Sequence, residues 1–111
     1  MKYFVNEETR KASGGTCYFE FQNGKFQNRC WLKDSLYLHA DVFDELMLYR
    51  LFSGAIEDFD YYGENKVSKE QWNSILKNAK EDARWESVIE ELRPWVEECF
   101  KKHKYFTICG I

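Results

Sequence analysis

The clearest alternation of apolar and polar residues lies at residues 16–22. Cys17, Phe19 and Phe21 fall on one face of an extended chain, and polar or amphipathic side chains fall on the other. Strict alternation of this kind is typical of a half-buried β-strand. The Asn23-Gly24 dipeptide that follows favours a two-residue type I′ turn. We therefore predict a hairpin with a return strand over residues 25–32.

A two-residue turn also fixes the register of that hairpin, and it places Cys17 directly opposite Cys30. Directly opposite Cβ atoms lie ~4.5–5.5 Å apart, which is longer than a relaxed disulfide needs. We favour two adjacent free thiols over a redox switch at this position.

Two shorter apolar segments predict further strands at residues 2–5 and 36–39. From Asp41, which we expect to cap a helix, apolar residues continue to Leu51 around most of the helical circumference. This distribution predicts the most buried helix of the protein, with Gly54 just beyond its end.

Ser68 and Gln71 form the sequence pattern of a capping box, in which each side chain accepts a hydrogen bond from the other residue's amide. Val67 and Trp72 flank the box at the spacing of a hydrophobic staple. Apolar residues then recur at helical spacing, so we predict a helix over residues 69–80.

The remaining chain predicts a long helix at residues 83–103 and a final strand at Tyr105–Ile111. Pro94 interrupts the helical pattern, and proline removes a backbone donor and crowds the preceding turn. We expect either a kink or two helices, with Pro94 near the start of the second. Strands first, helices next and a closing strand indicate a single α+β domain over residues 1–111, with an antiparallel sheet packed against three to four helices.

Composition supports a folded domain, because 44% of the residues are hydrophobic and 18% are aromatic. The net charge of −3 is unevenly distributed. Residues 1–33 carry six bases and three acids, whereas residues 34–98 carry sixteen acids and seven bases. A phosphate backbone requires a continuous basic face, so we expect a basic protein partner and no nucleic acid. With no apolar segment long enough for a membrane span and no signal-peptide pattern, we expect no membrane association and a cytoplasmic location.

No catalytic or cofactor-binding motif is present. His39 and His103 are too isolated in sequence to suggest a dyad, and the Gly14-Gly15 pair lacks the lysine of a phosphate-binding loop. The four cysteines lack the paired spacing of zinc ligands. We predict no catalytic residue, no cofactor and no metal.

The acidic and aromatic residues between positions 57 and 64 are harder to explain by folding alone. Here four acids and no base are interleaved with aromatic residues. One reading is a loop that is anchored by its aromatic residues while the acids remain hydrated. The other is a protein-binding surface, because tyrosines provide stiff contact area and carboxylates pair with Lys or Arg. The predicted partner-binding residues are Glu57, Asp58, Asp60, Tyr61, Tyr62 and Glu64.

In general character the chain resembles the immunity proteins of bacterial polymorphic-toxin and contact-dependent growth inhibition systems. The resemblance lies in the segment FDYYGENKVSKEQW, in the C-terminal FTICGI, and in the combination of acidic patches with many Trp and Tyr residues. Such proteins differ in fold, so no residue role carries over by position. The resemblance implies a cytoplasmic inhibitor that neutralises a cognate toxin, most plausibly a basic nuclease, by covering its active site or substrate path.

Two other functions remain open. One is a small enzyme with an unrecognised pocket, for which Tyr61, Glu64 and His39 are the candidate residues. The other is a structural or regulatory subunit that dimerises through an edge strand. A pocket with converging polar groups would favour the enzyme, and a large apolar patch on a two-fold axis would favour the dimer.

Overall fold

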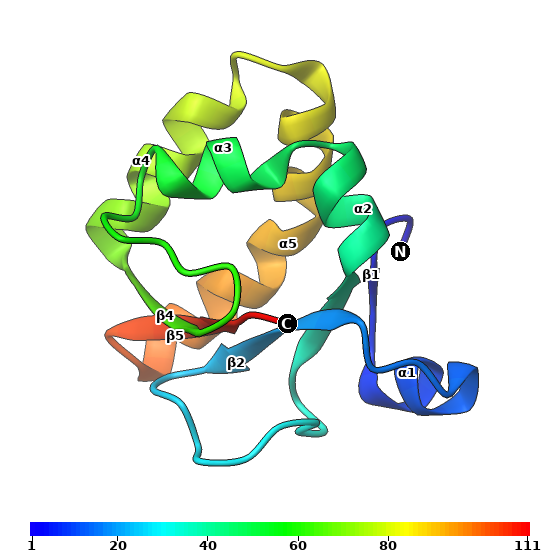
Figure 1. Cartoon of the computed structure of the whole chain (residues 1–111). Coiled ribbons are helices and arrows are strands. Elements are labelled where there is room, and N and C mark those ends of the chain that lie inside the picture. Colours follow the sequence, from blue (N-terminus) through cyan, green and yellow to red (C-terminus); the bar gives the residue numbers. More distant parts are fainter.

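The computed structural model describes all 111 residues, and its centre is one antiparallel sheet of five strands (Figure 1). The strands lie in the order β1-β3-β2-β5-β4. Their bounds are β1 Phe4–Val5, β2 Tyr18–Asn23, β3 Leu36–His39, β4 Glu64–Ser68 and β5 Tyr105–Cys109. The fold class is therefore α+β, as the sequence predicts.

Four helices cover one face of the sheet (Figure 1). They are α2 Ala40–Glu45, α3 Leu48–Ser53, α4 Lys69–Ala79 and α5 Ala83–Lys102. The apolar residues of the strands, such as Phe19, Phe21 and Ile108, are completely buried in the core that these helices share with the sheet. Because directly opposite residues of paired strands share a face, the register Phe21↔Ile108 and Phe21↔Leu36 aligns this apolar surface across three strands.

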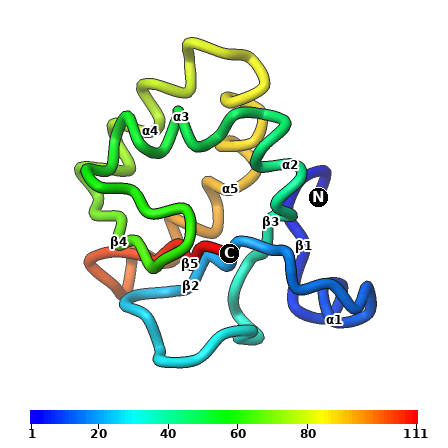
Figure 2. Tube along the Cα trace, in the orientation of Figure 1, coloured from blue at the N-terminus to red at the C-terminus, as the bar shows by residue number.

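The opposite face of the sheet carries polar side chains, including the buried Glu20, Gln22 and Thr107. It is covered by the segment of residues 24–35 and by the short helix α1, Glu7–Ser13 (Figure 2). A sheet with one apolar and one polar face thus has two different covering layers.

The helical predictions in the second half of the chain are confirmed. Helix α4 begins after Ser68, and both hydrogen bonds of the predicted capping box are present. Helix α5 covers almost the predicted range, but it runs as one helix through Pro94. The expectation of two helices at that point is wrong. The predicted final strand forms as β5, and it pairs with β2 and β4.

The predicted hairpin is wrong. The chain does turn at Gly24, which has a positive φ of 70°, but residues 25–32 form no strand. A strand has only two edges, and β3 and β5 occupy both edges of β2. Consequently Cys17 does not face Cys30: its carbonyl accepts a hydrogen bond from the amide of Ala40. All four cysteines carry free thiols.

The predicted helix from Asp41 to Leu51 is interrupted. His39, rather than Asp41, caps α2, because its Nδ1 accepts the amide hydrogen of Asp41. The helix ends before Met47, whose φ of 56° is left-handed, and α3 then begins. The indole of Trp85 donates to the carbonyl of Leu46 at this break, at 2.8 Å. A distant side chain therefore supplies one of the polar contacts where the helical bonding stops.

Two elements were not predicted. Helix α1 lies in a polar segment and is capped by Asn6, which accepts from the amide of Thr9. Strand β4 lies at an edge of the sheet, and only Asn65 and Val67 are buried in it. None of the five helices combines the length and the apolar character that a membrane crossing requires.

Candidate functional site

Residues 57–64, which we call the acidic loop, connect α3 to β4 and are anchored from beneath by aromatic residues. Phe59 is only 6% exposed, and its ring stacks on those of Phe43 and Phe52 at 6.3 and 5.8 Å between centroids. Phe59 also meets the ring of Tyr49 edge-on. Burial of a phenylalanine removes a large apolar area from water, so this residue fixes the middle of the loop to the core.

A buried asparagine holds the turn at the end of the loop. The side-chain oxygen of Asn65 accepts the amide hydrogen of Asp60 at 2.7 Å, and its nitrogen donates to the carbonyls of Asp60, Gly63 and Ile108. The carboxylate of Asp60 accepts from the amide of Tyr62. Asp60 is therefore part of the turn itself, although its side chain also faces solvent.

The chain beyond β5 fastens the same loop. Gly110 donates its amide hydrogen to the carbonyl of Gly63 at 2.7 Å, and Ile111 donates to the carbonyl of Tyr61 at 3.0 Å. A Cβ atom on Gly110 would lie 2.0 Å from the Tyr61 oxygen. Only glycine allows the two backbones to approach this closely.

Tyr61 links the acidic loop to α2. Its hydroxyl donates to the carboxylate of Asp44, with the two oxygens at 2.9 and 3.1 Å. Its ring packs edge-on against Phe19 and Phe43. Burial, followed by the neighbouring Asp44 carboxylate, raises the pKa of Tyr61 to about 12, so the hydroxyl remains a hydrogen-bond donor well above neutral pH.

Three of the five large apolar side chains that remain exposed lie around this loop. Tyr62 is 76% exposed, and its ring lies 4.9 Å from that of Tyr61. Tyr49 and Ile111 are 46% and 42% exposed, and they contact the loop through Phe59 and the Tyr61 backbone. These side chains leave apolar area exposed to solvent beside the acids.

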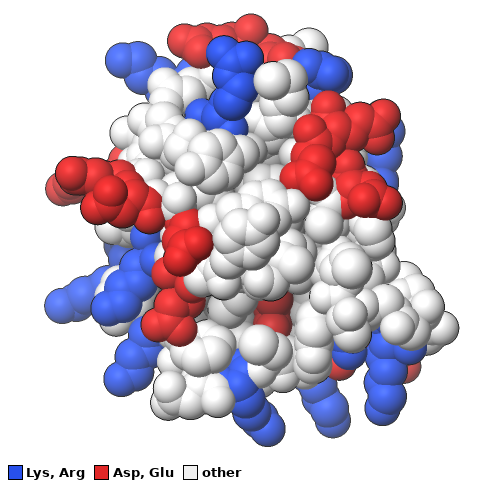
Figure 3. Space-filling model, viewed as in Figure 1, with Lys and Arg blue, Asp and Glu red and all other residues white.

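Carboxylates lie on both sides of this exposed area (Figure 3). Glu57, Asp58 and Glu64 are exposed on the acidic loop, and Asp58 has a left-handed φ of 57°. Helix α2 supplies a second acidic group. We call the whole area the acidic tyrosine surface, and its residues are Asp41, Asp44, Tyr49, Glu57, Asp58, Asp60, Tyr61, Tyr62 and Glu64.

The sequence located only the loop half of this surface. The acids of α2 are adjacent in sequence to a helix start, where acidic residues are common for local reasons. Only the hydrogen bond between Tyr61 and Asp44, across 17 positions, joins them to the acidic loop. The loop alternative, in which aromatic residues anchor the segment and the acids remain hydrated, also describes Phe59 and Glu57 correctly.

The three residues considered for an enzyme have separate roles. His39 caps α2, and Tyr61 donates to Asp44. Glu64 is the exposed first residue of β4 and pairs with Cys109 in the sheet register. No hydrogen bond joins any two of these three residues.

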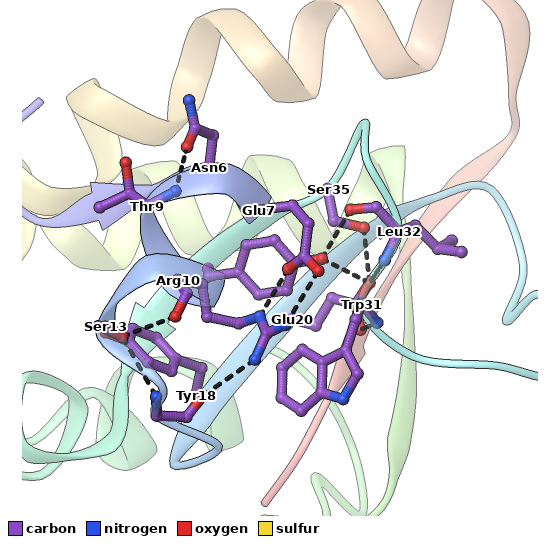
Figure 4. Close-up of polar contacts among 12 residues, drawn as sticks. Asn6, Glu7, Thr9, Arg10, Ser13, Tyr18, Glu20, Trp31, Leu32 and Ser35 are labelled. Carbon is purple, nitrogen blue, oxygen red and sulfur yellow. Dashed lines mark hydrogen bonds and ion pairs between the residues drawn. The ribbon is translucent and has the colours of Figure 1, made fainter.

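A second group of polar residues lies on the other face of the sheet, under residues 24–35, which we call the basic loop (Figure 4). The carboxylate of Glu20, only 2% exposed, accepts from the amides of Trp31 and Leu32 at 2.8 and 2.9 Å. The Ser35 hydroxyl also donates to it, at 2.8 Å. The Tyr37 hydroxyl lies 3.3 Å from the same carboxylate and donates at 2.6 Å to the carbonyl of Leu32. Hydrogen bonds of this number satisfy a buried carboxylate.

Arg10 of α1 completes this group. It forms a two-pronged ion pair with Glu7, and its guanidinium lies 3.8 Å from the centre of the Trp31 ring. The Arg10 charge, through hydrogen bonding, holds the pKa of Glu7 below its usual value. These contacts bind α1 to the basic loop and have a structural role.

No group of three or more His, Cys, Asp or Glu side chains is arranged to hold a metal ion. Comparisons of the chain with models of protein families, with curated proteins and with solved structures find no match. The site must therefore be interpreted from its own geometry.

Proposed function

We propose that the protein is an immunity-type inhibitor that binds a basic toxin domain through the acidic tyrosine surface. The observation that carries this proposal is the position of exposed Tyr62 and Tyr49 between two groups of carboxylates. Aromatic residues are enriched where protein interfaces bury most of their area, and clustered carboxylates complement Lys and Arg on a partner.

The anchoring of the loop supports the same proposal. Phe59, Asn65 and Gly110 hold the backbone of the acidic loop from three directions. A surface that is already ordered loses less conformational entropy when it binds. The carboxylates of Glu57 and Glu64 make no ion pair within the chain, so binding a cationic partner breaks no internal salt bridge at these two acids.

The most direct test of the proposal uses the product of the gene immediately upstream of the one that encodes this chain. If that product is a toxin, co-expression of this protein should restore growth of cells that produce it. The affinity of the purified pair should fall as salt rises, because surface charge pairs are screened.

Charge reversal then tests the surface itself. Glu57→Lys with Glu64→Lys should weaken binding by at least about 100-fold, since each reversal turns an attraction into a repulsion. The matched control is Glu81→Lys with Glu86→Lys, which makes the same charge change at exposed residues outside the surface. Equal weakening by both pairs would show that net charge alone matters. Undiminished binding by the first pair would place the interface elsewhere.

Asp58 and Asp60 are unsuitable for reversal. Asp58 adopts a left-handed φ, which Asp adopts more readily than most residues other than glycine, and Asp60 accepts a hydrogen bond within the turn. Tyr62→Ser is the better third variant, because the ring is exposed and its removal leaves the anchors of the loop in place. We expect a loss of about 2 kcal/mol in binding free energy for a buried interface tyrosine.

A further inference from the structure

The basic loop borders a hollow of about 550 Å³ on the side of the protein that carries α1. The hollow is lined mainly by polar residues: Asn23, Gln27, Arg29, Trp31, Leu32, Lys33, Asp34 and His103. It lies next to the polar face of the sheet and away from the acidic tyrosine surface. In Figure 3, Lys and Arg side chains project along the lower edge, where this loop lies, and acids lie on both sides of the uncharged area above it.

The basic side chains of the hollow have no internal partners. Arg29 and Lys33 are exposed and form no ion pair and no side-chain hydrogen bond within the chain. The imidazole of His103 packs over Gly24 and is likewise free of ion pairs. The only acid in the lining is Asp34, and its carboxylate already accepts a hydrogen bond from the Asn23 amide at 3.2 Å.

The backbone of the loop is held in place by buried polar side chains of two strands, β2 and β5. Gln22 donates to the carbonyl of Arg29 at 2.9 Å and accepts from the amide of Gln27. Glu20 holds the amides of residues 31 and 32, and Thr107 donates to the carbonyl of Gly24 at 2.8 Å. At the far end, the Trp95 indole donates to the carbonyl of Asp34.

This arrangement is costly for the fold, because burying a carboxylate and an amide requires that every polar atom be satisfied. Long connections without helix or strand inside a compact domain are usually functional or disordered, and these anchors make this one ordered. An ordered loop that keeps two cationic side chains unpaired beside a hollow has the composition of an anion site.

We propose that this hollow binds a small phosphate-bearing ligand, with Arg29 and Lys33 as the charged contacts and His103 as a third donor. Arg provides paired N–H donors that match phosphate oxygens, and Lys provides a point charge. A long nucleic acid is a poorer fit, because the net charge of −3 and the acidic middle of the chain repel an extended polyanion.

Pyrophosphate is the first probe, and amide chemical shifts of the full-length protein are the measurement. Titration at low ionic strength should shift the resonances of residues 24–34 and 103 in a saturable way, whereas equal ionic strength of chloride should not. Arg29→Gln with Lys33→Gln should weaken this binding by at least about tenfold. The control is Lys77→Gln with Lys80→Gln, which removes two exposed, unpaired charges elsewhere, and it should leave the affinity within about twofold.

Three results would overturn the proposal. They are the absence of saturable shifts, equal weakening by the control pair, and tighter binding of a single-stranded oligonucleotide with shifts spread well beyond the hollow. The spectra of all variants report folding directly, so an unfolded variant is recognised. The hollow lies on the opposite side of the sheet from the acidic tyrosine surface. A negative result for phosphate binding therefore leaves the toxin-binding test unaffected.

Discussion

The acidic loop and the basic loop are both long connections without regular structure, yet they are held by opposite means. The acidic loop is anchored by Phe59, whose ring enters the aromatic core under the helices. The basic loop is anchored by Glu20, whose carboxylate lies buried on the other face of the sheet. A sheet with one apolar and one polar face thus offers two ways to order a loop. In the acidic loop an apolar ring anchors a segment of exposed acids. In the basic loop a buried carboxylate anchors a segment with exposed bases.

The largest expected effect comes from removing the aromatic anchor. Phe59→Ala should destabilise the protein by about 3–4 kcal/mol, because it deletes a buried ring and leaves a cavity. Urea unfolding measures this value. Amide hydrogen exchange of the acidic loop should accelerate by more than the global loss of stability accounts for. Exchange of the basic loop should show no acceleration beyond that global effect.

Tyr62→Ala is the matched control for that experiment, since it removes a ring from the same loop that is 76% exposed. It should change stability by less than about 0.5 kcal/mol. If both variants were equally destabilised, the loop would not depend on its buried ring.

Removing the polar anchor should have the next largest effect. In Glu20→Gln an amide nitrogen, which cannot accept a hydrogen bond, replaces one carboxylate oxygen. At least one of the donors from Trp31, Leu32 and Ser35 then loses its acceptor. We expect a loss of about 2–3 kcal/mol from buried donors left unsatisfied, with faster exchange of the amides of residues 31 and 32.

The control for this substitution is Glu8→Gln, which changes an exposed glutamate of α1 and should be nearly neutral. A stable Glu20→Gln protein with unchanged exchange would contradict the assigned role of the carboxylate. Faster exchange in the acidic loop alone would show that Glu20 orders the acidic loop and not the basic loop.

The smallest effect concerns the hydroxyl of Tyr61. Tyr61→Phe should cost less than about 1 kcal/mol at pH 7, as expected for one partly exposed hydrogen bond. The pKa of Tyr61 is raised to about 12 in the folded protein, from the ordinary tyrosine value of 10.0. Its contribution is therefore complete below pH 10 and is lost as the pH rises from 10 to 12.

Thermal unfolding of wild type and Tyr61→Phe across this range isolates the effect, because the variant should lose less stability between pH 10 and 12. Cys109, whose pKa burial raises to about 12, titrates in both proteins and cancels in the difference. Parallel pH profiles would show that the Tyr61 hydroxyl is not held in the folded state.

The sequence predicted those parts of the fold that depend on neighbouring residues. The capping box at Ser68 and the apolar spacing of α4 and α5 are local patterns, and each formed nearly where expected. The acidic loop was also recognisable, because its charges and aromatic residues are contiguous.

The errors arose where distant residues outweigh local preference. Asn23-Gly24 is a strong hairpin signal, but β3 and β5 together take both edges of β2. Glu20 and Gln22 look like ordinary solvent-facing residues of an alternating strand, and nothing local indicates that they bury themselves against residues 27–32. The α2 half of the acidic tyrosine surface was missed for the same reason, since one hydrogen bond across 17 positions joins it to the acidic loop.

The position of β5 in the sheet has a consequence for synthesis of the chain. This strand, residues 105–109, separates β2 from β4 and pairs with both. Until β5 has emerged from the ribosome, one edge of β2 is open. The rings of Phe21, Trp72, Trp95 and Phe100 also lack their contact with the ring of Phe106. Strand edges that stay open during folding promote aggregation. Nascent chains paused before residue 105 should therefore bind chaperones, and release from them should follow completion of this single strand.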